Sequence, residues 1–168
     1  MPQTLTIIIP AFNEAGTIKI ILKKIFSVQL IHKVRKEVIV VDDASQDATA
    51  EQVNSFMKSH PEENIKILRQ DANQGKGAAI HRGIAEATGD FIVIQDADTE
   101  YNPEEYNTLL QPVLDGFADV VYGSRFVGGE PHRILFFWHS IGNKLLTTLS
   151  NMFTNLNLTD METGYKLF

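Results

Sequence analysis

Two aspartates separated by one residue, Asp96 and Asp98, form the most informative chemical pattern in this sequence. They directly follow a short apolar run, which places both carboxylates at the end of a predicted strand. Beside a diphosphate each carboxylate would repel the anion by about 4 kcal/mol at 4 Å and an effective dielectric constant of 20. A divalent cation reverses the sign of this interaction, and all-oxygen ligands favour Mg²⁺ or Mn²⁺ over zinc. The pattern predicts a metal–diphosphate site at Asp96, Ala97 and Asp98.

Glu100 lies two residues beyond this pair and is a candidate third ligand or a holder of a metal-bound water. The competing interpretation is an acidic turn that caps a helix beginning at Pro103. We favour the metal site because the acids follow a buried strand rather than an isolated loop.

Polar residues at other predicted strand ends extend this site. Asp42 and Asp43 follow EVIVV, and either carboxylate can accept hydrogen bonds from a base or ribose, while the other caps the next helix. Asn73–Gly77 is a glycine-containing turn before a helix, so Lys76 is a nucleotide contact or a solvated cation. Arg125 can donate a planar fork to a phosphate.

Composition predicts one folded domain. The chain has 168 residues, of which 43% are hydrophobic and 21% charged, and a net charge of -6, which argues against a nucleic-acid partner. The absence of cysteine excludes disulfides and fits a reducing cytoplasm. The longest apolar run, Ile134–Trp138, is too short to span a bilayer, so any membrane contact is expected to be peripheral.

Strands and helices alternate along the chain, which predicts an α/β fold with a mainly parallel sheet flanked by helices. Helices are expected around Ile18–Ile25, from Ser45 through Met57, around Ile80–Ala87, from Pro103 and over Trp138–Met152. The expected strands are Thr4–Pro10, Glu37–Val41, Ile65–Leu68, Asp90–Gln95 and Ala118–Tyr122. Ligands of such folds bind beyond the carboxyl ends of the strands, where the acids above and Asn13 and Glu14 lie.

Five segments in order carry a family resemblance: IIIPAFNEAGTI, VIVVDDASQDAT, NQGKGAAIHRGIAEATGDFIVIQDAD, VVYGSRF and LTDMETGYKLF. Together they resemble family-2 inverting glycosyltransferases, especially the dolichyl- or polyprenyl-phosphate mannosyl- and glucosyltransferases. The resemblance covers essentially the whole chain and implies one Rossmann-like GT-A catalytic domain over residues 1–168. Family members usually continue further, so the chain is expected to be either a natural short form or a domain truncated at its C terminus.

The resemblance implies a role for each matching position. It places Asp42 on the base or ribose and makes Asp96 and Asp98 the metal and diphosphate residues. Asp98 and Arg125 are the expected catalytic residues, and Arg125, Arg133 and Lys166 are expected on the acceptor side. Together with the residues above, the expected nucleotide contacts are Pro10, Phe12, Asn13, Glu14, Asp42, Asp43, Lys76, Asp96 and Ala97.

The implied reaction moves a hexose from a UDP- or GDP-sugar to dolichyl or undecaprenyl phosphate. A phosphate monoester has a second pKa near 6 and attacks without a general base if cations hold it in line. Relatives that act on sugar hydroxyls usually carry a late acidic base, often in a Glu-Asp pair. Here the late acids are only Asp160 and Glu162, in a pattern like that of the lipid-phosphate branch.

Aromatic residues in Ile134–Trp138 suit a membrane interface, although the same run could begin a buried helix. We therefore expect a cytoplasmic protein with peripheral contact at the cytoplasmic membrane face. Two alternatives remain: transfer to a saccharide hydroxyl in cell-wall or polysaccharide synthesis, and a nucleotide-sugar-binding module without turnover. The sugar, the base and the presence of a homo-oligomer are left open.

Overall fold

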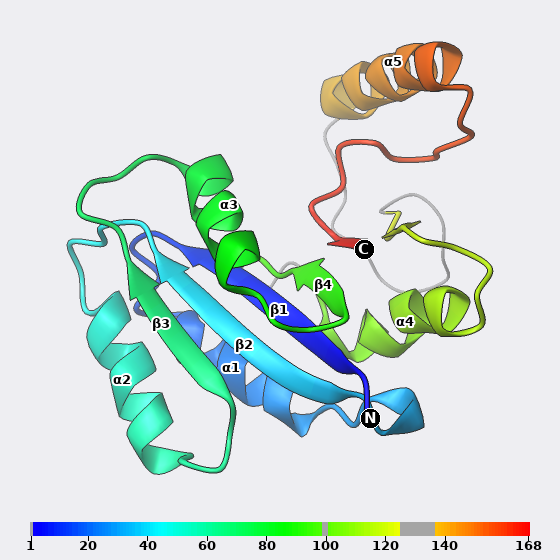
Figure 1. Cartoon of the computed structure of the whole chain (residues 1–168). Coiled ribbons are helices and arrows are strands. Elements are labelled where there is room, and N and C mark those ends of the chain that lie inside the picture. The colour runs from blue at the N-terminus through cyan, green and yellow to red at the C-terminus, as the bar shows by residue number, and fades with distance from the viewer. Residues whose placement is uncertain (1, 99–100, 125–136) are drawn as a thin grey trace.

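The computed structural model describes residues 2–98, 101–124 and 137–168. Within them the strands form one six-stranded sheet in the order β3-β2-β1-β4-β6-β5 (Figure 1). The strands are β1 Thr4–Ala11, β2 Arg35–Asp42, β3 Ile65–Arg69, β4 Phe91–Ile94, β5 Val121–Tyr122 and β6 Lys166–Leu167. The helices are α1 Ile18–Ser27, α2 Thr49–Ser59, α3 Lys76–Glu86, α4 Tyr106–Leu114 and α5 Phe137–Thr154, with 3₁₀ turns η1 Ile31–Lys33 and η2 Pro103–Glu105.

The sheet is mainly parallel, which confirms the predicted α/β class. β1 pairs in parallel with β2 on one side and β4 on the other, and β2 pairs in parallel with β3. Only β6 runs against its neighbours, β4 and β5, in the described part of the chain. The strand order reverses between β1 and β4, and open α/β sheets bind ligands at such a switch point.

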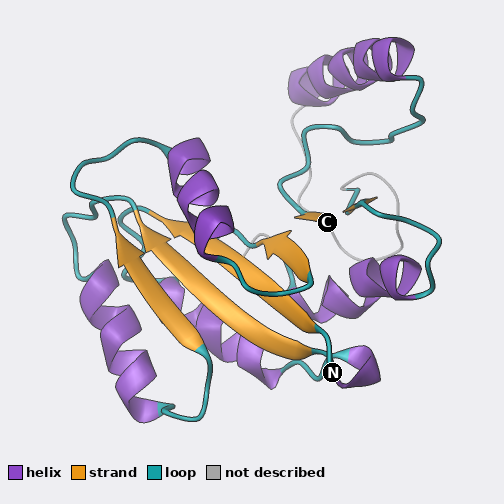
Figure 2. Cartoon of the chain, viewed as in Figure 1, coloured by secondary structure: helices purple, strands orange, loops and turns teal. Residues whose placement is uncertain are grey.

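Helices lie on both sides of the sheet (Figure 2), and alternating residues of β1 supply both faces of the core. Leu5, Ile7 and Ile9 are fully buried in the cluster that α1, α2 and α4 cover. Ile8 points to the other face, which α3 covers. A Cβ atom at Gly83 of α3 would lie 2.5 Å from Ile8 Cγ2, so glycine permits the close approach of α3 to the strand. This packing presents the N terminus of α3 at the carboxyl end of β1.

Several predicted boundaries were wrong. The second helix begins at Thr49 rather than near Ser45, because the Ser45 hydroxyl accepts a hydrogen bond from the Asn13 amide instead of capping that helix. The predicted helical start at Pro103 is confirmed, although the first turn is a 3₁₀ turn and α4 begins at Tyr106. The fifth strand is only Val121–Tyr122. Strand β6 was not predicted, because its two residues are too few to show alternation.

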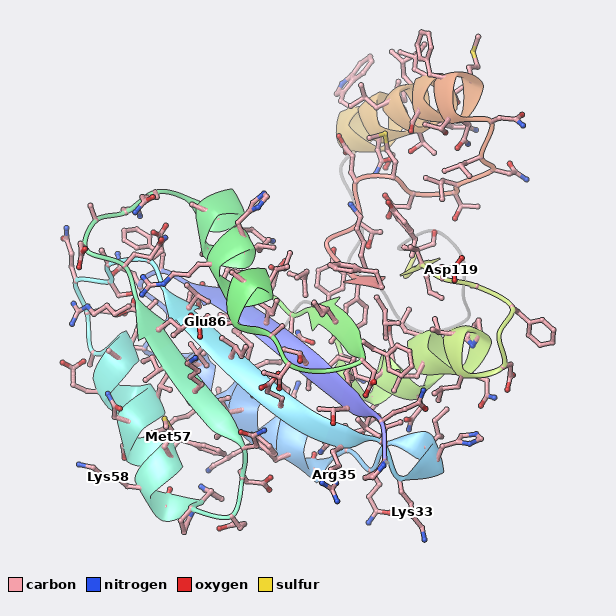
Figure 3. All side chains as sticks on the ribbon, in the orientation of Figure 1. Lys33, Arg35, Met57, Lys58, Glu86 and Asp119 are labelled. Carbon is pink, nitrogen blue, oxygen red and sulfur yellow. The ribbon has the colours of Figure 1, made fainter. Side chains whose placement is uncertain are left out.

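Helix α5 lies at one end of the molecule (Figure 3), and in it the polar side is buried while the apolar side is exposed. Its polar side faces the rest of the chain: Asn143 and Thr147 are buried, and Asn143 donates to Asp160 Oδ1 at 2.8 Å. Its apolar side is exposed and repeats every three or four residues. That side consists of Trp138, Ile141, Leu145, Leu146, Leu149, Met152 and Phe153. No helix within the described residues is long and apolar enough to cross a membrane.

Candidate functional site

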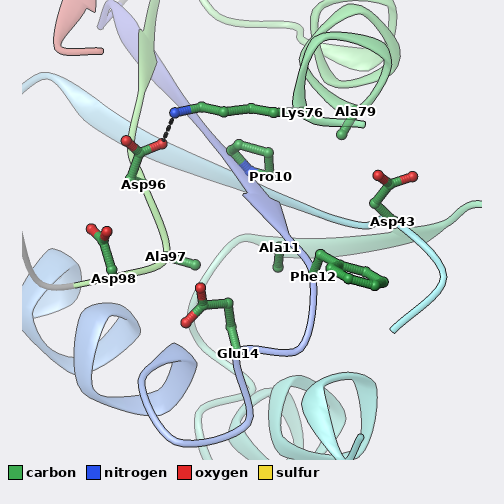
Figure 4. Close-up of a pocket in the computed structure, with 10 residues that line it drawn as sticks. All are labelled: Pro10, Ala11, Phe12, Glu14, Asp43, Lys76, Ala79, Asp96, Ala97 and Asp98. Atoms are coloured by element: carbon green, nitrogen blue, oxygen red, sulfur yellow. Dashed lines mark ion pairs between the residues drawn. The ribbon is translucent and has the colours of Figure 1, made fainter. Parts of the chain in front are cut away.

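A pocket of about 250 Å³ opens at the carboxyl ends of β1, β2 and β4 (Figure 4). It therefore lies at the point where the strand order reverses. The lining residues are Pro10, Ala11, Phe12, Glu14, Asp43, Lys76, Ala79, Asp96, Ala97 and Asp98. Most of the residues predicted as nucleotide contacts are thus brought together, although they come from four separate segments of the chain.

The loops after β1 and β2 brace each other beneath the pocket. The Asn13 amide donates to Ser45 Oγ at 2.9 Å, and Asn13 Oδ1 accepts from the Gln46 amide at 2.9 Å. The Glu14 amide donates to Thr49 Oγ1 at 2.8 Å. Asn13 and Ala44 both have a φ of 58°, a left-handed conformation that is unusual for alanine. Asn13 does not line the pocket, and its hydrogen bonds join the Phe12–Glu14 loop to the loop after β2.

Asp43 faces the pocket and organises the start of α3. Its carboxylate accepts from the Gln74 amide at 2.9 Å, the Gly75 amide at 2.7 Å and Gln70 Nε2 at 2.6 Å. Gly75 has a φ of 86°, which favours glycine. These bonds fix the turn that presents Lys76 and the N terminus of α3 to the pocket.

Asp42 lies outside the lining, and its side chain is 0% exposed. Its Oδ1 accepts from the Ser45 amide at 3.0 Å, whereas Oδ2 has no hydrogen-bond partner among the described residues and lies 3.4 Å from Arg69 Nε. The geometry separates the two aspartates, since Asp43 borders the cavity and Asp42 lies beneath the exposed guanidinium of Arg69. A base contact by Asp42 stays a prediction.

The charge of the lining is strongly unbalanced. Among the described residues that line it, four acids, Glu14, Asp43, Asp96 and Asp98, accompany one cation, Lys76. Lys76 extends from α3 past Pro10 and forms an ion pair with Asp96 Oδ1 (Figure 4). The carboxylates offer only oxygen ligands and already attract an ammonium group, so the donor set fits a hard divalent cation. Within the described ranges no cluster of three or more His, Cys, Asp or Glu forms a complete metal site.

Gln95 anchors the loop that carries these aspartates. Its Nε2 donates at 3.2 Å both to the Asp96 carbonyl and to the Tyr101 carbonyl, and its Oε1 accepts from the Tyr106 hydroxyl at 2.8 Å. Burial raises the pKa of the Tyr106 hydroxyl far above its ordinary value, so it remains a donor. Sequence reasoning missed this anchor, because a glutamine at the end of an apolar strand gives no recognisable motif.

The segment before β6 closes against the same loop. The Gly164 amide donates to the Tyr101 hydroxyl at 3.0 Å, and a Cβ atom at Gly164 would lie 3.2 Å from Asp96 Oδ2. The late acids do not enter the pocket: Asp160 is buried beside α5, and Glu162 is exposed outside the lining. Neither is placed as a general base.

The geometry of this pocket does not test the remaining site predictions. Glu100, Arg125 and Arg133 lie outside the described residues. Lys166, expected on the acceptor side, does not line the cavity, and its Nζ lies 5.0 Å from the centre of the Tyr122 ring. Their proposed roles stay predictions.

Residues 6–168 match the family model described as glycosyl transferase family 2, and the chain belongs to that family. It is 32% identical over 124 residues to a dolichol-phosphate mannosyltransferase of Pyrococcus furiosus, covering 74% of this chain and 34% of the relative. It is also 32% identical over 131 residues to a dolichyl-phosphate β-glucosyltransferase of Dictyostelium discoideum, covering 72% and 39%. The chain thus spans little more than a third of the length of these relatives.

Solved structures confirm the GT-A fold. A mannosyltransferase of Pyrobaculum calidifontis in complex with GDP-mannose and Mn²⁺ matches with a TM-score of 0.59 and 30% identity, covering 71% of this chain and 33% of that one. Glucosyl-3-phosphoglycerate synthase of Mycobacterium tuberculosis matches with a TM-score of 0.72 and 22% identity, covering 98% and 55%. The second match extends the likeness in fold to nearly the whole chain.

Proposed function

We propose that this chain is the donor-binding catalytic core of an inverting glycosyltransferase that moves a hexose from a UDP- or GDP-sugar to a polyprenyl phosphate. Asp96 and Asp98 would hold Mg²⁺ or Mn²⁺, so that the transfer would be metal-assisted. The acidic pocket at the strand-order switch point carries this proposal. A nucleotide diphosphate is an anion, and among the described lining residues four acids face one lysine, so the anion would be repelled unless a cation joined it to the carboxylates.

The described residues would divide the work of donor binding. Asp96 and Asp98 would hold the cation, which when bound neutralises charge on the diphosphate as it leaves. Asp43 positions the turn at the N terminus of α3, where the helix dipole favours the anion. Phe12 is half exposed at the mouth and offers an apolar surface for the nucleoside.

Three observations support a lipid phosphate as the acceptor: the names of the relatives, the position of the late acids and the exposed apolar side of α5. Both relatives quoted above are named for dolichol phosphates. Asp160 and Glu162 do not line the pocket, so neither is placed there as a late general base. A phosphate oxygen of the lipid would attack the anomeric carbon as the bond to the diphosphate breaks. The exposed apolar side of α5 suits a lipid interface at the cytoplasmic membrane face.

Calorimetry with UDP and GDP tests the metal–donor site. We expect the wild-type chain to bind one of them in the presence of Mn²⁺, and Asp98→Ala to weaken that binding about 100-fold, because one of two cation ligands is lost. Asp119→Ala, an exposed aspartate outside the pocket (Figure 3), is the matched control and should bind like the wild type. Unchanged nucleotide affinity in Asp98→Ala would refute the metal site.

A screen of donor against acceptor tests the reaction. UDP-glucose and GDP-mannose are each incubated with Mn²⁺ and either polyprenyl phosphate or soluble glycans. Product that forms with polyprenyl phosphate but not with the glycans supports the proposal. Product with a glycan alone would refute the lipid acceptor, and donor binding without any product would identify a binding module.

A further inference from the structure

Lys76 and Asp96 occupy opposite walls of the pocket and neutralise each other in the structure. Lys76 is the first residue of α3, and Asp96 follows β4, so their contact joins the two sides of the switch-point cavity. The Lys76 side chain is 53% exposed and that of Asp96 20% exposed. No other basic residue lines the cavity within the described part of the chain.

We infer that Lys76 is an internal counter-ion that a divalent cation must displace from Asp96, so that the cation and the nucleotide bind cooperatively. This inference rests on the proposed donor and metal site. Without a nucleotide, a cation at Asp96 would leave the Lys76 ammonium beside a second positive charge, which opposes binding. With a nucleotide diphosphate present, the displaced ammonium has an anionic partner, and this penalty disappears.

The physical design of the contact supports an exchange rather than a permanent bond. Lysine carries a compact charge on a flexible stem of four carbons, so its head group can change partners while α3 stays in place. Asp43 fixes the turn before Lys76 through the Gln74 and Gly75 amides, which anchors the stem. The Lys76 side chain can therefore move while the turn before α3 stays in place.

The consequence is a coupling between two ligands. By thermodynamic linkage, the factor by which the nucleotide tightens Mn²⁺ binding equals the factor by which Mn²⁺ tightens nucleotide binding. Removing the lysine charge should strengthen the binding of Mn²⁺ alone and weaken that of the nucleotide with Mn²⁺. A residue that only holds phosphate would weaken nucleotide binding without tightening Mn²⁺.

The test measures Mn²⁺ binding directly by electron paramagnetic resonance, with and without saturating UDP or GDP. In Lys76→Met we expect Mn²⁺ alone to bind about fivefold tighter, a moderate effect because the ion pair is partly exposed. We expect the nucleotide to bind about tenfold more weakly in the presence of Mn²⁺. The coupling factor, by which the nucleotide tightens Mn²⁺ binding, should fall at least fivefold.

Two further variants serve as controls. Lys66→Met removes a lysine that is 49% exposed and paired with Glu86 at the other end of α3, away from the pocket (Figure 3), and should leave both affinities unchanged. Lys76→Arg retains the charge and should keep Mn²⁺ affinity within about twofold of the wild type. Thermal melts of each variant check that the fold is intact.

The outcomes separate this inference from the proposed function. Equal or weaker binding of Mn²⁺ alone in folded Lys76→Met, when the wild type binds Mn²⁺, would overturn the exchange but leave the metal site standing. If the wild type binds no Mn²⁺ even with UDP or GDP, the proposed metal-assisted function itself fails. Tighter Mn²⁺ together with weaker nucleotide binding supports both.

Discussion

Glu37 and Asp96 are partly buried acids at opposite ends of the same sheet, and they are held in different ways. Glu37, near the amino end of β2, accepts from Thr6 Oγ1 at 2.5 Å, the Thr88 amide at 2.9 Å and Thr88 Oγ1 at 2.7 Å. Asp96, at the carboxyl end of β4, is paired with the flexible Lys76. Hydrogen bonds from short neutral side chains and a backbone amide hold the Glu37 carboxylate in place. Asp96 is instead paired with a flexible lysine, which we propose can be displaced.

Gly89→Ala should break the amino-end arrangement most severely. A Cβ atom there would lie 2.5 Å from Thr6 Oγ1, 2.7 Å from the Thr4 carbonyl oxygen and 2.9 Å from the Thr6 amide nitrogen. Because two of these atoms are strand backbone, relief requires the strand to move, and we expect a loss of about 3 kcal/mol in the free energy of unfolding. Urea denaturation measures this loss.

Gly16→Ala is the control for this substitution, since a Cβ atom at this position in the loop after β1 would have no neighbouring atom within 4 Å. It should change the free energy of unfolding by less than about 1 kcal/mol. Similar losses in the two variants would contradict the close approach at Gly89.

Glu37→Gln should have a smaller effect, about 1 kcal/mol of unfolding free energy at neutral pH, because charge-assisted hydrogen bonds become neutral ones. Burial by itself raises the pKa of Glu37, but the hydrogen bonds from Thr6 and Thr88 outweigh it and hold the pKa below its ordinary value. The stabilisation is therefore present above the unfolded pKa of about 4.3 and is lost as the pH falls through the folded pKa.

Urea denaturation at several pH values checks this sign. The difference in the free energy of unfolding between the wild type and Glu37→Gln should narrow as the pH drops below about 4. Glu62→Gln, at an exposed glutamate, should show no gap at any pH. A gap that widens in acid would contradict the assignment of Glu37 as a locked carboxylate.

Asp96→Asn should have the smallest effect on stability, within about 0.5 kcal/mol, because the side chain of its partner Lys76 is about half exposed and ion pairs screened by water contribute little. The same substitution should abolish measurable Mn²⁺ binding in the presence of UDP or GDP, since it removes a proposed ligand. Denaturation and paramagnetic resonance on one preparation test both parts. A loss of stability comparable to that of Gly89→Ala would show that Asp96 is structural and would erase the contrast with Glu37.

Local patterns in the sequence determined the framework of this protein. Short runs rich in β-branched residues predicted β1, β2, β3 and β4, and several of these runs are apolar nearly throughout, as expected for strands covered on both faces. The spacing of Ile18, Ile21, Leu22 and Ile25 predicted the buried side of α1. Acids at the strand ends then located the pocket, since parallel strands bring their carboxyl ends together.

Only the tertiary structure decided which of these polar residues meet. Asp42 and Asp43 are neighbours of the same type and both are buried, yet only Asp43 lines the pocket, whereas Asp42 lies against Arg69. The contact between Lys76 and Asp96 depends on how closely α3 packs on the sheet, and the insertion of β6 depends on pairing far along the chain. Periodicity records which face of an element is apolar, whereas a contact between distant residues depends on the packing of the whole fold.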